Sequence, residues 1–183
     1  MNKKISTRML CEGAIMVAAA QLLGYLKLYR LPQGGSVTLV MLPIFLFSFR
    51  WGWKSGVLAG FTLGLLQLMF DGAYTWGWQS VFGDYLLAYA ALGLAGLFGK
   101  VRGGYVLGMT AGFLARFACH FYTGAVIWAE YMPEVMYGIK MTGAGVYSLV
   151  YNASYLVPSF ALCVMVALLV KKPLDRLPAA DKG

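Results

Sequence analysis

Long apolar runs, separated by short polar or charged segments, dominate this sequence. Six runs have the character of helices within a bilayer, where about 20 residues cross the hydrocarbon core. We expect helices over residues 10–28, 37–50, 54–71, 81–99, 104–128 and 145–170. The second run is short and contains Pro43, which predicts a helix that is broken or covered by its neighbours.

Composition supports this interpretation. Hydrophobic residues make up 60% of the 183 residues and charged residues only 12%, whereas soluble domains have roughly 25% charged residues. We therefore predict one all-α integral membrane domain over residues 1–183. No small-residue cleavage site follows the first apolar run, so we expect that run to remain in the protein. The cysteines Cys11, Cys119 and Cys163 are isolated, which is typical of small buried side chains.

The basic residues are unevenly distributed between the two sides of the predicted bundle. With the N-terminus inside, eleven of the 15 Lys and Arg residues fall in inner segments, three in outer segments, and Arg116 within a helix. This bias predicts cytoplasmic N- and C-termini. We therefore expect the basic residues behind the net charge of +8 to orient the protein and contact lipid headgroups, and not to bind nucleic acid. Four acids near the outer side favour a cationic ligand, although solvated loop acids explain them equally well: Asp71, Asp84, Glu130 and Glu134.

Small residues recur at four-residue spacing in several of the expected helices. This spacing places them on one helix face, where bare backbone lets a neighbouring helix approach closely. We expect two glycine ladders to pack within the bundle. The pair Ala14-x-x-x-Ala18 serves either the bundle or a partner helix, and spacing alone does not distinguish these. The ladders are Gly52, Gly56, Gly60 and Gly64, and Gly104, Gly108 and Gly112.

The sequence lacks motifs for several kinds of chemistry. The stretch GLAGLFGK ends like a phosphate-binding loop, but Leu94 stands at the first glycine position and Val101 where Ser or Thr must bind magnesium. A single histidine cannot supply H-E-x-x-H, and there is no G-x-S-x-G. We therefore expect no ATP hydrolysis, no metal and no cofactor in this chain.

Polar side chains in the last three expected helices indicate a site. In RFACHFYTGAVIW, Arg116 and the only histidine, His120, are four residues apart and share a helix face, with Trp128 eight residues further on. Charged groups within a membrane normally face the bundle interior and mark function, although a core histidine bonded to a carbonyl remains an alternative. The outer ends of the neighbouring helices add Asp84, Tyr85, Tyr147, Asn152 and Tyr155, and Tyr74, Trp76 and Trp78 are nearby in sequence.

These residue types suit a flat, positively charged heterocycle. Aromatic faces attract a cation by about 2 kcal/mol when desolvated, and the Asp84 carboxylate can neutralise it or pair with an aminopyrimidine edge. Interfacial aromatic belts explain single rings without any function, but they do not explain Asp84 or Asn152.

In these residues the chain resembles the thiamine-specific substrate-binding subunits (S-components) of energy-coupling factor (ECF) transporters. The similar stretches are LPQGGSVTLVMLPIFL, DYLLAYAALGLAGLFG, RFACHFYTGAVIWAEY and YSLVYNASYLVPS, which span most of the chain. The resemblance implies six helices, tight thiamine binding at the outer face, and docking on a separate membrane coupling subunit that two ATPases drive. It also implies that Ala14 and Ala18 form the docking surface.

The resemblance further assigns thiamine contacts to Asp84, Tyr85, His120, Trp128, Tyr147 and Asn152, and less directly to Tyr74. Asp84 is one methylene shorter than the glutamate that some members have, and LPQGGS lacks the aromatic residue that closes the pocket in others. No ligand contact follows for Arg116.

Three other functions remain open at this point. The cargo could be another vitamin or a thiamine precursor. A small membrane enzyme could use His120 and Asp84 as acid and base, but the sequence offers no nucleophile or metal. A purely structural subunit would leave Arg116, His120 and Asp84 unexplained.

Overall fold

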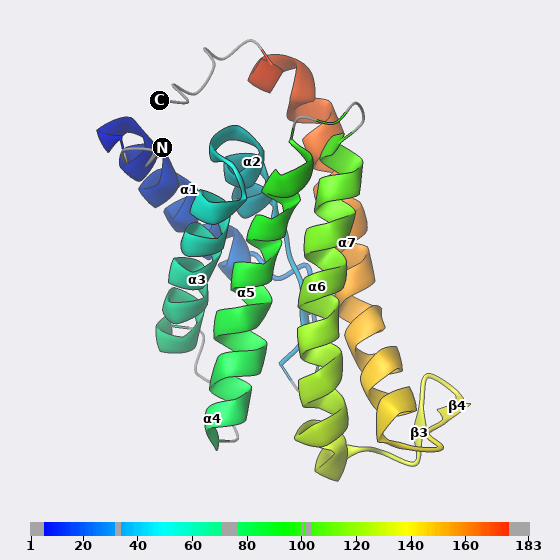
Figure 1. Ribbon diagram of the computed structural model, residues 1–183. Coiled ribbons are helices and arrows are strands. Elements are labelled where there is room, and N and C mark those ends of the chain that lie inside the picture. Colours follow the sequence, from blue (N-terminus) through cyan, green and yellow to red (C-terminus); the bar gives the residue numbers. More distant parts are fainter. Residues whose placement is uncertain (1–5, 32–33, 71–76, 100, 102–103, 176–183) are drawn as a thin grey trace.

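The computed structural model describes residues 6–31, 34–70, 77–99, 101 and 104–175, and these are mostly helical. Long helices pack side by side, and the start of α1 and the end of α7 lie at the same end of the molecule (Figure 1). The six-helix, all-α membrane fold expected from the sequence is confirmed. Five of its helices are α1 (Thr7–Tyr25), α2 (Leu42–Trp51), α3 (Trp53–Phe70), α6 (Gly104–Val126) and α7 (Ala144–Asp175).

The sixth helix is a helical run of changing pitch from Gly77 to Phe98. It consists of α4 (Gly77–Ser80), the π-helical segment η1 (Val81–Leu87), α5 (Ala88–Ala90) and the 3-10 segment η2 (Ala91–Phe98). Two short antiparallel hairpins complete the described part of the chain: β1 (Tyr29–Arg30) with β2 (Ser36–Val37), and β3 (Val135–Met136) with β4 (Ile139–Lys140). The short 3-10 segment η3 (Trp128–Tyr131) follows α6.

Several helices present apolar side chains outward, as a lipid-facing protein must. Gly77–Phe98 and Ala144–Val170 are each long and apolar enough to cross a membrane. Leu22 is 66% exposed, Met69 72% and Leu169 73%. A soluble protein rarely exposes so many large apolar side chains to water. This surface is therefore consistent with contact with lipid.

The first two helices differ from the predicted ranges for local reasons. α1 begins at Thr7 because the Ser6 hydroxyl caps it, accepting from the Met9 amide at 3.2 Å. The helix predicted from residue 37 starts only at Leu42, because the β1–β2 hairpin takes up the chain before it. Pro43 lies in the first turn of α2, where its missing N–H disrupts nothing, so the alternative of a broken helix is wrong.

α2 occupies the centre of the bundle, which is how so short a helix is accommodated. Ile44 and Phe45 are completely buried, as are Leu63 of α3 and Leu92 of η2. The expectation that neighbours cover this helix is therefore confirmed, and its backbone polar groups are shielded from lipid by protein.

The glycine ladders pack within the bundle, as expected. A Cβ added at Gly60 would collide with the Tyr89 carbonyl, and one at Gly112 would lie 2.9 Å from the Phe45 ring. Gly52, however, does not belong to the first ladder. It ends α2 with a φ of 88°, and a Cβ there would meet nothing within 4 Å. Its role is conformational, because only glycine adopts that backbone angle readily.

Candidate ligand-binding site

The helices enclose a cavity of about 150 Å³ in the half of the bundle away from the start of α1 and the end of α7. Its wall includes residues from α1, the segment after β1, α3, the Gly77–Phe98 run, α6 and α7. Six of the seven predicted site residues line it: Asp84, Tyr85, His120, Trp128, Tyr147 and Asn152. The seventh, Tyr74, lies outside the described residues.

Asp84 accepts four hydrogen bonds in this wall. Its Oδ2 accepts from the Ser80 hydroxyl at 2.9 Å and from the Trp128 indole at 3.1 Å. Its Oδ1 accepts from His120 Nδ1 at 3.0 Å and from the Thr123 hydroxyl. The carboxylate is thus held by four protein donors, which come from α4, α6 and η3.

The backbone around Asp84 is shaped to make these contacts. Asp84 and Tyr85 lie in the π-helical segment η1, a geometry often found at functional sites. Gly83 precedes them, and a Cβ there would collide with the methyl group of Thr123. Glycine at this position therefore lets η1 approach α6 closely enough for Thr123 and His120 to reach the carboxylate.

His120 and Arg116 carry polar atoms with no partner in the described part of the chain. An ionised carboxylate only accepts hydrogen bonds, so we assign the proton of the contact with Asp84 to His120 Nδ1. In the neutral ring, Nε2 is then a hydrogen-bond acceptor. This Nε2 is buried and unbonded, as are Nε and Nη1 of Arg116. Arg116 is 5% exposed, and its guanidinium lies 4.0 Å from the centre of the Tyr89 ring.

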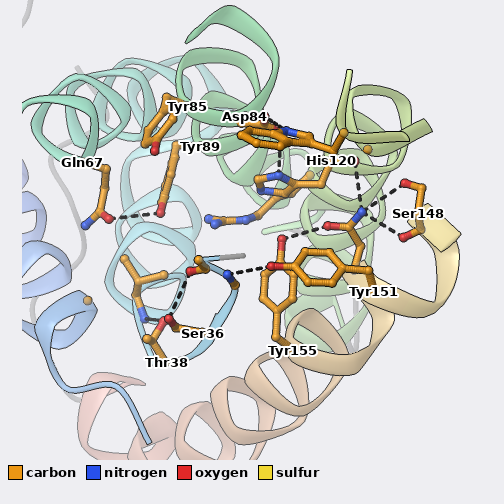
Figure 2. Close-up of a pocket in the computed structure, with 18 of the residues that line it drawn as sticks. Ser36, Thr38, Gln67, Asp84, Tyr85, Tyr89, His120, Ser148, Tyr151 and Tyr155 are labelled. Atoms are coloured by element: carbon orange, nitrogen blue, oxygen red, sulfur yellow. Dashed lines mark hydrogen bonds and ion pairs between the residues drawn. The ribbon is translucent and has the colours of Figure 1, made fainter. Parts of the chain in front are cut away.

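The α7 wall is fixed to α6 through Asn152. Its Nδ2 donates to the His120 carbonyl at 3.1 Å and to the Ser148 carbonyl at 2.9 Å, and its Oδ1 accepts from the Tyr155 hydroxyl at 2.9 Å. Figure 2 shows Tyr151 and Tyr155 on the opposite side of the cavity from Asp84. In this structure the Asn152 amide therefore positions α7 against α6 beside the cavity.

Sequence reasoning missed several residues of the wall. Tyr151 lines the cavity, and its hydroxyl accepts from the Gly35 amide at 2.9 Å, which joins the segment between β1 and β2 to α7. Its position four residues after Tyr147, on the same helix face, was the signal that could have identified it. Tyr89 and Gln67 also line the cavity, and the Tyr89 hydroxyl donates to Gln67 Oε1 at 3.3 Å (Figure 2).

Gln67 extends this hydrogen-bond chain to α1, because its Nε2 donates to Gln21 Oε1 at 2.9 Å.

Two other predicted features lie away from the cavity. Trp78 is 69% exposed, as an interfacial ring would be. Ala14 and Ala18 are both exposed on α1.

Together these features define a class of protein: an all-α membrane protein with side chains from several helices converging on one polar, aromatic-walled cavity, the arrangement of a small-molecule binding subunit. A family of sequences described as thiamine transporter protein (Thia_YuaJ) matches residues 10–178. The chain belongs to this thiamine transporter family, whose members are transport proteins and not enzymes.

Individual relatives agree with this assignment. The chain is 36% identical over 198 residues to the thiamine transporter ThiT of Bacillus subtilis (strain 168), covering 100% of both sequences. It is 31% identical over 174 residues to the thiamine transporter ThiT of Lacticaseibacillus paracasei, covering 85% of this chain and 82% of the relative.

Two solved structures share the fold. ThiT from Listeria monocytogenes superposes with a TM-score of 0.76 at 24% identity, over 90% of this chain and 93% of the other. The S component of a bacterial ECF transporter superposes with a TM-score of 0.61 at 16% identity, over 92% and 98%. At these identities the likeness concerns the fold.

Proposed function

We propose that this chain is the thiamine-binding S-component of an ECF-type uptake transporter and that thiamine occupies the cavity beside Asp84. The convergence of a carboxylate, a histidine acceptor and aromatic rings on this cavity carries the proposal. Among the described residues, no lysine or arginine forms an ion pair with Asp84, so its negative charge is available to a cationic ring.

The remaining contacts suit the two rings of thiamine. The unbonded Nε2 of His120 offers an acceptor for the amino group of the pyrimidine. Trp128 and Tyr147 offer faces for a flat cation, which aromatic quadrupoles attract. Tyr85 and Asn152 complete the proposed contacts on the Gly77–Phe98 run and α7.

A fluorescence titration tests this function. We expect thiamine to quench the tryptophan emission of the purified protein at nanomolar concentrations, and Trp128→Ala to abolish the quenching. Trp53→Ala is the matched control, because Trp53 is 41% exposed and lies outside the cavity. Competition with the isolated pyrimidine and with riboflavin identifies the cargo. If wild-type protein shows neither quenching nor calorimetric heat with thiamine, the proposal is wrong.

We also propose that α1 docks on the coupling subunit through Ala14 and Ala18. Both are exposed, whereas Val17 and Gln21 face the core, so the small residues form part of the outer surface of the helix. Ala14→Trp should prevent co-purification with the coupling subunit and its ATPases while leaving thiamine binding intact. Leu114→Trp, at a 56% exposed position on α6, is the control. Unchanged co-purification of the Ala14 variant would refute this surface.

We further infer the orientation in the membrane from the positive charges. Arg8, Arg50 and Lys54 lie on α1, α2 and α3 at the end where α1 begins and α7 ends (Figure 1). By the positive-inside rule this end faces the cytoplasm, which places the cavity toward the outside. Labelling of single cysteines from outside intact cells checks the assignment: Tyr137→Cys should react and Arg8→Cys should not.

A further inference from the structure

Every acceptor position of the Asp84 carboxylate is already occupied by the protein. An ionised carboxylate offers about four lone-pair positions on its two oxygens. Ser80 and Trp128 donate to Oδ2. His120 and Thr123 donate to Oδ1, so four protein donors occupy the four positions. A ligand that brings an N–H group to Asp84 therefore needs one of these donors to leave.

Thr123 differs from the other three donors, because its hydroxyl has further acceptors within reach. Its Oγ1 lies 3.2 Å from the Cys119 carbonyl oxygen and 3.1 Å from the His120 carbonyl oxygen, in the preceding turn of α6. A hydroxyl has a single proton, which rotates toward whichever acceptor is available. Within the described part of the chain, the other three donor atoms contact no acceptor except Asp84. Of the four bonds, the one from Thr123 is thus the one that can be exchanged without leaving a donor unpaired.

Thr123 is placed to act on the carboxylate and not on the ligand. Its side chain is 1% exposed and does not line the cavity. Its methyl group packs against Gly83, where an added Cβ would collide with it. The torsion that turns an aspartate carboxylate has a broad energy minimum. Loss of the Thr123 bond would therefore let Oδ1 turn toward a ligand while Ser80 still holds Oδ2.

We propose that Thr123 is a positioning residue that exchanges acceptors when the vitamin binds. In the arrangement seen here its hydroxyl donates to Asp84 and helps to satisfy a buried charge. When an N–H of the aminopyrimidine edge reaches Oδ1, the hydroxyl turns to the Cys119 or His120 carbonyl. Neither Thr123 nor Asp84 loses a hydrogen bond in either state, so the exchange avoids the cost of an unpaired buried group. This inference rests on the proposed function.

Thiamine titrations of Thr123→Ala and Thr123→Ser test the exchange, because these two variants differ only in the hydroxyl. Where the hydroxyl is present, binding replaces its charge-assisted hydrogen bond with a weaker neutral one. We therefore expect calorimetry to give a Kd for thiamine about threefold to tenfold lower in Thr123→Ala than in Thr123→Ser. A hydroxyl that stays on Asp84 in both states predicts the opposite sign. An equal or higher Kd in Thr123→Ala would overturn the proposal.

Thermal unfolding in detergent gives a readout that a purely structural role would not change. Without thiamine, Thr123→Ala should have a lower Tm than Thr123→Ser, because Asp84 lacks one donor. Saturating thiamine should reduce this difference, since the ligand then supplies the missing donor. A difference in Tm that is the same with and without thiamine would contradict the exchange.

Ser80→Ala is the matched control. Ser80 is also a fully buried hydroxyl that donates to Asp84, but it has no second acceptor among the described residues. Its loss should raise the Kd for thiamine, by about threefold to tenfold, because the carboxylate is less well held in both states. A Ser80→Ala variant that also binds more tightly would refute the assignment of the exchange to Thr123.

Two further arms keep the test decisive. If Thr123→Ala does not fold, the isosteric Thr123→Val replaces it in both measurements. Failure of the proposed function is recognised separately, because wild-type protein would then bind no thiamine. If wild-type protein binds thiamine and the variant without the hydroxyl binds no more tightly than Thr123→Ser, the function stands and the exchange is wrong.

Discussion

Two carboxylates in this bundle each accept an indole N–H, yet their surroundings differ in charge. Glu12, near the start of α1, accepts from Trp51 Nε1 at 2.7 Å, and also from Arg50 at 2.7 Å and Arg8 at 3.0 Å. Asp84 accepts from Trp128 Nε1 at 3.1 Å, but its other partners are Ser80, His120 and Thr123.

This difference separates a structural acid from a binding acid. The arginines compensate the charge of Glu12, so this side chain ties α1 to α2 and has little attraction left for a ligand. Asp84 is held in place by hydrogen bonds that orient it, with no arginine or lysine in ion-pair contact among the described residues. A carboxylate that is fixed in position and still charged is what a cationic ligand requires.

Exchanging each acid for its amide should give the largest contrast. Asp84→Asn removes the charge and places an NH2 group among four donors, so we expect the Kd for thiamine to rise by about 100-fold or more. Glu12→Gln should leave that Kd within about twofold, since it lies outside the cavity. Isothermal titration calorimetry measures both. An Asp84 variant that binds like wild type would remove the basis of the comparison.

The same Glu12→Gln variant should lose stability rather than affinity. Its carboxylate is 27% exposed, so we discount the ion pairs and expect a loss of about 1–2 kcal/mol. For a chain of this size that lowers Tm by roughly 2–4 °C for each kcal/mol, measurable by thermal unfolding in detergent. An unchanged Tm would mean that the arginines contribute nothing to the packing of α1.

Removing only the indole N–H from each acid sharpens the comparison further. Trp128→Phe keeps an aromatic face but deprives Asp84 of one donor, and we expect a Kd for thiamine about fivefold to tenfold higher. Trp51→Phe makes the equivalent change at Glu12 and should alter only Tm. Parallel titrations and melting curves distinguish the two, and a raised Kd in the Trp51 variant would contradict the division of roles.

The smallest effect is expected for an uncharged hydrogen bond between two helices. Gln67 Nε2 donates to Gln21 Oε1 at 2.9 Å between α3 and α1. A double-mutant cycle of Gln21→Leu and Gln67→Leu, read as free energy of unfolding in detergent, should give a coupling of about 0.6 kcal/mol, the average for interhelical hydrogen bonds in membranes. A coupling near zero would show that each amide finds another partner when its neighbour is lost.

The sequence could identify the main site residues because polar groups are costly in an apolar run. Asp84, His120 and Asn152 stand out by residue type alone, and their positions toward the outer ends of the last three expected helices place them at similar depth. The six-helix fold followed from the same contrast. Tyr151 and Gln67 did not stand out, since interfacial tyrosines are common and a glutamine within a helix has no pattern of its own.

Other features of the structure could not be predicted from the amino-acid sequence. The π-helical pitch around Asp84 is a matter of backbone hydrogen-bond register, which single residues do not encode. The two hairpins have strands of two residues each, too short for an alternating pattern. Gly52 matched the four-residue spacing of the ladder by coincidence, and only its positive φ reveals that it terminates α2.

The contact between Gln21 and Gln67 also constrains how this chain can vary. Both amides are buried, so a leucine at one position would remove a hydrogen-bond partner of the other, leaving Gln67 with only its contact to Tyr89, or Gln21 with only its contact to Tyr25. Tolerated changes at these two positions should therefore occur together, with both polar or both apolar. Gln67 also accepts from the Tyr89 hydroxyl in the cavity wall. A change at Gln21 on α1, the helix that carries Ala14 and Ala18, would therefore alter the surroundings of a residue that lines the cavity.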